Sequence, residues 1–150
     1  MKMAMDGPDA DHQRPEGLDD DTVEALGKLS EALESIERAR GHLYTMHQLT
    51  GKADFLLDDV VAGLRRAGRG GAADLVETEL LGRNVLPGRW TFQVVEEYDD
   101  GYYAAFQRIE RQLRDELAGG RRHLWEAELK ERRRTRGQPG HEALPGPDAY

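Results

Sequence analysis

The sequence contains no cysteine, so disulfide bonds and thiolate chemistry are excluded. A chain without disulfides is typical of a reducing compartment, and we expect a cytoplasmic location. No stretch approaches the roughly 18 consecutive apolar residues of a membrane-spanning helix. The first 21 residues also lack the apolar core that a signal peptide needs. We therefore expect a protein that does not associate with membranes.

The sequence also lacks the motifs of common enzyme classes. No Glu is followed by a His three residues later, which excludes the paired E-x-x-H ligands of di-iron bundles. H-E-x-x-H, G-x-S-x-G and Walker A motifs are absent as well. Residues 68–73 have the outline G-x-G-x-x-A, but they follow a predicted helix and not a strand, so we interpret them as a helix–helix turn. The sequence predicts no catalytic residue, no metal site and no cofactor.

What the chain does contain is charge and helical periodicity. Hydrophobic residues make up 38% and charged residues 33% of it, a balance typical of helices with one apolar and one solvated face. We interpret Gly51 as the C-terminal end of the first long helix. The pattern predicts an all-α antiparallel helical bundle. Two long helices are expected at about 21–49 and 90–117, a shorter middle pair at about 53–67 and 72–84, and a C-terminal helix at about 121–134.

The two ends of the chain differ in composition from the middle. Residues 1–18 are acidic and contain Pro and Gly, and residues 137–150 are rich in Pro and Gly. Segments of this kind bury too little apolar surface to offset the entropy of ordering. We expect both to be disordered, on either side of a helical bundle domain over residues 19–136. The sequence leaves open whether the second long helix continues through Gly119 and Gly120.

Three ionisable residues fall on the apolar stripes of the long helices. Arg40 and His47 lie on the first stripe, and Asp99 lies in the middle of the second. If the helices are antiparallel with Leu49 level with Trp90, Arg40 comes level with Asp99, and a charge in a core needs such a partner. Further hydrogen bonds could come from Tyr44, Tyr102 and Asn84. We interpret the pair as a structural salt bridge; the alternative is a polar ligand pocket that includes His47.

Two other segments carry candidate binding residues. The acidic run 96–100 could bind a metal ion together with His47, but we interpret it as a solvated face. The connection 82–90 places Arg89 at the start of a helix, where free amides and the helix dipole favour an anion. A plain turn at Pro87 and Gly88 is the preferred interpretation of that connection.

The outer halves of the long helices present apolar surface. Leu29 and Leu33 face Leu113 and Leu117, with no third helix from the middle of the chain to cover them. An exposed apolar patch of this size is typical of an interaction site. Either the last helix, with Trp125, folds back over the patch or a second copy of the chain does. We expect a homodimer.

The net charge of −8 is unevenly distributed. Residues 1–37 carry eleven acidic and three basic residues, whereas residues 121–137 carry seven basic and three acidic ones. An acidic chain repels nucleic acid at long range, so nucleic-acid binding is not expected, and only residues 121–137 could support it. We predict a non-enzymatic protein-interaction or regulatory module that self-associates or docks a partner. The alternative is a bundle, which could be an enzyme, that binds a small ligand or a metal ion around Arg40, His47 and Asp99.

Overall fold

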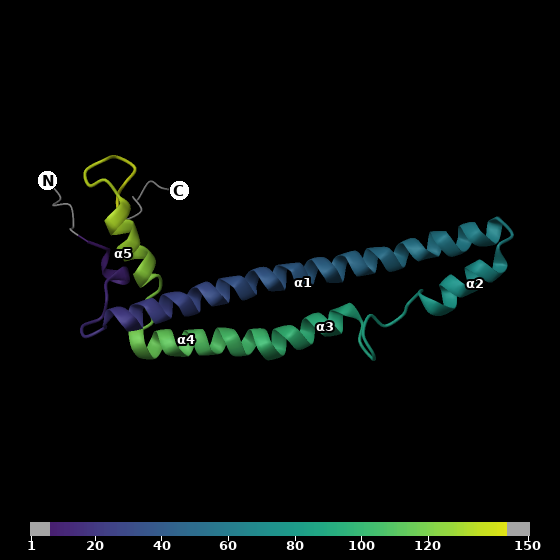
Figure 1. Cartoon of the computed structure of the whole chain (residues 1–150), viewed down its shortest axis with the longest axis horizontal. Coiled ribbons are helices and arrows are strands. Elements are labelled where there is room, and N and C mark those ends of the chain that lie inside the picture. The colour runs from purple at the N-terminus through teal and green to yellow at the C-terminus, as the bar shows by residue number, and fades with distance from the viewer. Residues whose placement is uncertain (1–6, 144–150) are drawn as a thin grey trace. The chain divides into compact units, whose positions relative to one another are not determined.

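The computed structural model describes residues 7–143, and residues 1–6 and 144–150 of the predicted disordered ends lie outside this part. Apart from one isolated β-bridge between Leu86 and Arg89, all regular structure in residues 7–143 is helical, which confirms the predicted all-α class (Figure 1). The elements are η1 (Ala10–His12), α1 (Asp20–Arg66), α2 (Gly70–Glu79), α3 (Thr91–Tyr98), η2 (Asp99–Tyr103), α4 (Ala104–Ala118) and α5 (Leu124–Arg133).

The chain forms two compact units. One contains the residues up to 34 together with those from 106 onward, and the other contains residues 35–105. Because α1 passes through the boundary, its first turns belong to one unit and the remainder to the other. None of the helices within residues 7–143 has both the length and the apolar composition that crossing a bilayer demands.

α1 is a single helix of 47 residues, and it joins the two helices that were predicted over 21–49 and 53–67. Its start agrees with the sequence, because the three consecutive aspartates there suit a helix N-terminus. The Thr22 N–H donates to Asp19 Oδ1 at 2.7 Å, which makes Asp19 the capping residue. The long first helix of the prediction is therefore correct at its beginning and too short at its end.

The predicted helix end at Gly51 is wrong. Gly51 keeps a helical backbone and does not adopt the left-handed conformation of a C-terminal cap. A single glycine inside a helix costs only about 1 kcal/mol relative to alanine, and apolar periodicity continues beyond it. The glycine that ends α1 is Gly68, whose φ is +69°. The next residue closes the cap, since the Arg69 N–H donates to the Leu64 carbonyl at 2.8 Å.

In the unit of residues 35–105, α2 folds back along the last turns of α1 (Figure 1). Arg65 of α1 pairs with Asp74 of α2 at 3.0 Å and also with Glu77. Gly82 follows α2 with a φ of +67°, and its N–H donates to Asp54 Oδ1 at 2.8 Å. These contacts hold α2 and the segment that follows it against α1. The helix α2 ends at Glu79, earlier than the predicted end near residue 84.

The connection from α2 to α3 turns at Pro87 and Gly88, as the sequence predicts, and the φ of Gly88 is +70°. α3 begins with a cap at Trp90, whose N–H donates to Gln93 Oε1 at 2.8 Å. This side-chain contact satisfies one of the amide groups that a helix N-terminus leaves unpaired.

A π-helical segment, η2, separates α3 from α4 where one α-helix was predicted over 90–117. Its hydrogen bonds run from residue i to residue i+5, so the turn takes in an extra residue and shifts the faces of the helix that follows. The burial pattern of α4 shows this shift. Glu110 and Ala118 are buried, whereas Ile109 and Leu117 of the predicted stripe are 41% and 46% exposed.

α4 ends at Ala118 and does not continue through Gly119 and Gly120. Both glycines have positive φ values, +58° and +76°, and so does His123 at +57°. A non-glycine residue in this region is uncommon, and here it stands directly before α5. The last helix therefore begins at Leu124, three residues later than the predicted start near 121.

The unit that contains α4 and α5 has a small core. Val23, Ala118 and Leu124 are at most 6% exposed, and they come from α1, α4 and α5. α5 lies close to α1, because a Cβ added to Gly27 would be 3.3 Å from Trp125 Cβ. The last helix thus covers the first turns of α1, which was one of the two arrangements left open by the sequence.

The segment before α1 also contacts α5. Arg14 Nε and Nη2 donate to the two oxygens of Glu128 at 2.5 and 2.9 Å. Arg14 Nη1 donates to Asp20 Oδ1 at 2.6 Å. A guanidinium group bound to two carboxylates in this way connects the N-terminal segment, the start of α1 and α5.

Candidate functional site

The predicted contact between Arg40 and Asp99 is present. Arg40 lies on α1, and Asp99 is the first residue of η2. Arg40 Nε donates to Asp99 Oδ1 at 2.7 Å, and Nη2 donates to Oδ2 at 3.0 Å. The pair is therefore bidentate, and the antiparallel alignment from which it was predicted is correct at this level of the two helices.

Two tyrosines and a second carboxylate surround this pair. The Arg40 guanidinium carbon lies 4.9 Å from the ring centre of Tyr44 and 4.8 Å from that of Tyr103. The Tyr44 hydroxyl is 3.4 Å from Asp99 Oδ2, and the Tyr103 hydroxyl donates to the Glu37 carboxylate at 2.6 and 2.7 Å. We call these five residues the Arg40 cluster. The cation–π contacts add to the charge pair at one point of α1.

The sequence predicted Tyr102 in this site, and the structure has Tyr103 there instead. Tyr102 is exposed, and its ring lies 5.9 Å from that of Tyr98. The reason is η2: a stripe drawn at 3.6 residues per turn passes through residue 102, but the wider π turn moves this residue away from the face of Asp99.

The Arg40 cluster is less buried than the apolar stripes suggested. The side chains of Arg40 and Asp99 are 31% and 24% exposed. The hydrogen bonds from Arg40 lower the pKa of Asp99 below its ordinary 3.8, although burial opposes them. The hydrogen bond to Glu37 raises the pKa of Tyr103 above its ordinary 10.0. Because these polar groups bind one another, the geometry favours a structural role, and ligand binding at the cluster stays a prediction.

The other predicted ligand-binding residues lie elsewhere in this unit. His47 Nδ1 shares a hydrogen bond of 2.7 Å with Thr91 Oγ1 at the start of α3. Arg89 Nε donates to Glu97 Oε1 at 2.6 Å. Asn84 lines a separate pocket. The structure therefore assembles Arg40 with Asp99 and distributes His47, Arg89 and Asn84 over other contacts.

That separate pocket lies in the unit of residues 35–105, and its lining is mostly apolar. Its volume is about 530 Å³, and Phe55, which is 76% exposed, stands at its edge. Leu80, Val85 and Trp90 are also exposed, so several large apolar side chains meet solvent in one place. We call it the Phe55–Trp90 pocket. Its lining consists of Thr50, Gly51, Ala53, Asp54, Phe55, Leu57, Leu80, Gly82, Arg83, Asn84, Val85, Trp90 and Thr91.

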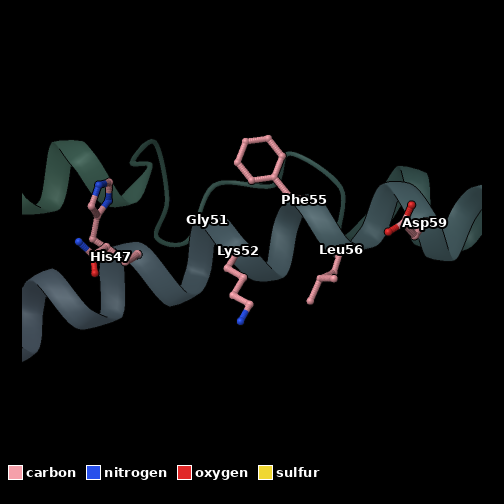
Figure 2. Close-up of a pocket in the computed structure, with 7 residues that line it drawn as sticks. His47, Gly51, Lys52, Phe55, Leu56 and Asp59 are labelled. Atoms are coloured by element: carbon pink, nitrogen blue, oxygen red, sulfur yellow. The ribbon is translucent and has the colours of Figure 1, made fainter.

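A second depression of about 630 Å³ lies along α1 alone (Figure 2). In Figure 2, His47 and Phe55 point to one side of the helix, and Lys52 and Leu56 point to the other. Since all of its lining residues belong to one helix, no second element encloses it. It is an open surface rather than a binding cavity for a small molecule.

The predicted interface residues lie in the unit that contains α4 and α5. Leu29, Leu33 and Leu113 are half-buried, whereas Leu117 and Trp125 are exposed. The exposure of Leu117 follows from the phase shift after η2. Self-association through these residues remains a prediction.

The sequence analysis missed a polar group in the same unit. Glu110 is buried, lies 3.7 Å from Arg114 Nη1, and accepts a hydrogen bond of 3.4 Å from Ser30. Arg114 Nε is buried and has no hydrogen-bond partner among the described residues. Periodicity at 3.6 residues per turn gave no signal for Glu110, because it becomes buried only through the change of phase at η2.

The alternative of a metal site in the acidic run 96–100 has no geometric support. Within residues 7–143, no three His, Asp or Glu side chains lie together as metal ligands would. Comparisons with known proteins add no constraint, because no family model, no curated protein and no solved structure matches the chain. The function has to be inferred from the geometry of the two units.

Proposed function

We propose that the chain is a non-enzymatic protein-interaction module that docks a partner through the Phe55–Trp90 pocket. The observation that carries the proposal is the exposure of Phe55, 76%, at the edge of a pocket whose other apolar residues are also exposed. Clustered apolar surface of this kind is rare on soluble monomers and typical of interaction sites.

The pocket favours an apolar segment of a protein as its occupant. Aromatic residues such as Phe55 and Trp90 are enriched among the residues that dominate binding energy in interfaces. Two of the polar groups in its lining are already engaged, since Asp54 accepts from Gly82 and Thr91 shares a hydrogen bond with His47. An amphipathic helix that inserts apolar side chains fits such a lining.

The test compares variants of the full chain in capture experiments from native lysate, followed by mass spectrometry. Phe55→Ala and Trp90→Ala should each reduce the captured partner more than about tenfold, the loss expected for a residue that contributes most of the binding energy. Leu75→Ala is the matched control, because Leu75 is exposed in the same unit but outside the pocket lining. Equal capture by all of these variants would contradict the proposal.

A further inference from the structure

α1 has a second apolar face that its own unit does not cover. The residues through which α1 contacts that unit, Arg40, His47, Asp54 and Arg65, recur at spacings of 7, 7 and 11 and therefore share one face of the helix. Leu49, two positions after His47, lies on the opposite face. In Figure 2, Leu56 accordingly points away from the side of His47.

The opposite face carries a heptad pattern. Small or apolar residues follow one another at alternating spacings of 3 and 4. Three of the large ones, Leu49, Leu56 and Val60, are 60%, 54% and 42% exposed, and Met46 is half-buried. A spacing of 3.5 residues is the pattern by which one α-helix packs against another in a coiled coil. A second helix is therefore the kind of partner that fits this face. The seam consists of Met46, Leu49, Ala53, Leu56, Val60 and Gly63 of α1.

We infer that the helix on this seam is α1 of a second copy of the chain, running antiparallel about a two-fold axis between Asp54 and Phe55. In that register each large side chain meets a smaller one across the seam, as close packing of two helices requires. The facing pairs, each formed twice, are Leu49 with Val60, Leu56 with Ala53, and Met46 with Gly63 of the second copy.

The charges beside the seam select the same register. Lys52 and Asp59 flank the seam on one side, both are exposed, and neither has an ion-pair partner among the described residues. In the antiparallel register Lys52 lies beside Asp59 of the second copy, and the symmetry forms this pair twice. A slip of one heptad in either direction would place Lys52 beside Lys52 or Asp59 beside Asp59. A parallel pair would place Lys52 beside Leu57 instead.

The first test is the mass of the full chain over a range of concentrations, by sedimentation equilibrium. The chain should form dimers, and Leu56→Asp should raise the dimer dissociation constant more than tenfold, because it buries a charge in the seam. Leu75→Asp, an exposed apolar residue outside the seam, is the control. Lys52→Asp and Asp59→Lys should each weaken the dimer, and the double variant should restore it. A monomer at all concentrations, or a dimer that Leu56→Asp leaves intact, overturns the inference.

The second test fixes the direction and uses the absence of native cysteine. A mixture of Leu49→Cys and Val60→Cys chains should form a disulfide between the two variants on mild oxidation. Leu49→Cys alone should not, because its two copies would lie about 16 Å apart along an antiparallel seam, beyond the reach of a disulfide. Cross-linking of Leu49→Cys with itself would show a parallel pair and overturn the register. The seam shares Ala53 with the lining of the Phe55–Trp90 pocket. Because Phe55 and Trp90 lie outside the seam, failure of the dimer would leave the docking proposal unaffected.

Discussion

The Arg40 side chain has three partners. The guanidinium edge binds Asp99, and its carbon lies within 5 Å of the ring centres of Tyr44 and Tyr103. A lysine has one ammonium group and cannot reproduce the bidentate contact together with two ring contacts. The cluster therefore depends on arginine at this position, and it joins α1 to η2 at the one turn where the second helix departs from α geometry.

The pH dependence of unfolding should report the contact of Arg40 with Asp99. The pKa of Asp99 is lowered in the folded chain, so its contribution to the free energy of unfolding is complete above the ordinary value of 3.8. This contribution is lost as the pH falls through the lower, folded pKa. Asp99→Asn should therefore be less stable than the parent at pH 6, and the difference should shrink below pH 4. Urea unfolding between pH 3 and pH 7 measures it.

Asp100→Asn is the control for this prediction, because Asp100 is the exposed neighbour of Asp99. It removes the same charge and should leave the unfolding curves close to those of the parent at every pH. If Asp99→Asn and Asp100→Asn have the same unfolding curves, the bidentate contact of Arg40 with Asp99 contributes nothing to stability. A folded Asp99→Asn chain that loses a bound small molecule would instead support the ligand-binding alternative.

For individual residues, the sequence predicts the contacts that follow from regular helical periodicity. Arg40 and Asp99 were paired correctly because both lie on stripes before the helix changes phase. Tyr103 was missed because periodicity alone does not reveal a π turn. Asn84 and Arg89 lie in a connection whose contacts depend on the packing of α2, and periodicity does not describe that segment.

The length of α1 predicts that alanine substitutions at two glycines change the free energy of unfolding in opposite directions. A Cβ at Gly51 would meet nothing within 4 Å, and the backbone there is helical. Gly51→Ala should raise the free energy of unfolding by about 0.5–1 kcal/mol. Gly68 has a φ of +69°, so Gly68→Ala should lower it. Thermal unfolding followed by circular dichroism measures both.

If Gly51→Ala lowered the free energy of unfolding and Gly68→Ala raised it, the first helix would end at Gly51 and not at Gly68. The sequence alone could not choose between the two glycines, because both follow helical periodicity. What decides is tertiary contact: Arg65 pairs with Asp74 of α2, and Asp54 accepts from Gly82 after α2, and both contacts favour continuation of the helix to Arg66. The start of the helix was predictable because Asp19 acts locally, through the Thr22 amide.

Few hydrophobic side chains are buried in the described part of the chain. In the described part of the chain, the buried hydrophobic residues are Val23, Ala73, Val95, Ala118 and Leu124. Leu124→Ala should lower the free energy of unfolding by about 2–5 kcal/mol, the usual cost of truncating a buried leucine. Leu75→Ala should change it by less than about 0.5 kcal/mol, since Leu75 is 63% exposed. Urea titration of both variants at one protein concentration measures the difference.

Fixing the concentration matters because the proposed dimer would contribute to stability. A chain that buries apolar surface only in a dimer gains free energy of unfolding as its concentration rises. The seam on α1 and the Phe55–Trp90 pocket both leave large apolar side chains in solvent in the single chain. A midpoint of unfolding that increases with protein concentration would agree with the proposed dimer.

The π turn at η2 also has a consequence for sequence alignment. A related chain with an unbroken α-helix here would be one residue shorter between positions 99 and 103. With a gap placed at η2, the apolar residues of such a relative would occupy the places that Glu110 and Ala118 have in this chain. By residue type those apolar residues resemble Ile109 and Leu117 instead. An ungapped alignment would match residues on different faces of α4. Relatives of this protein should therefore be aligned with a gap allowed at η2.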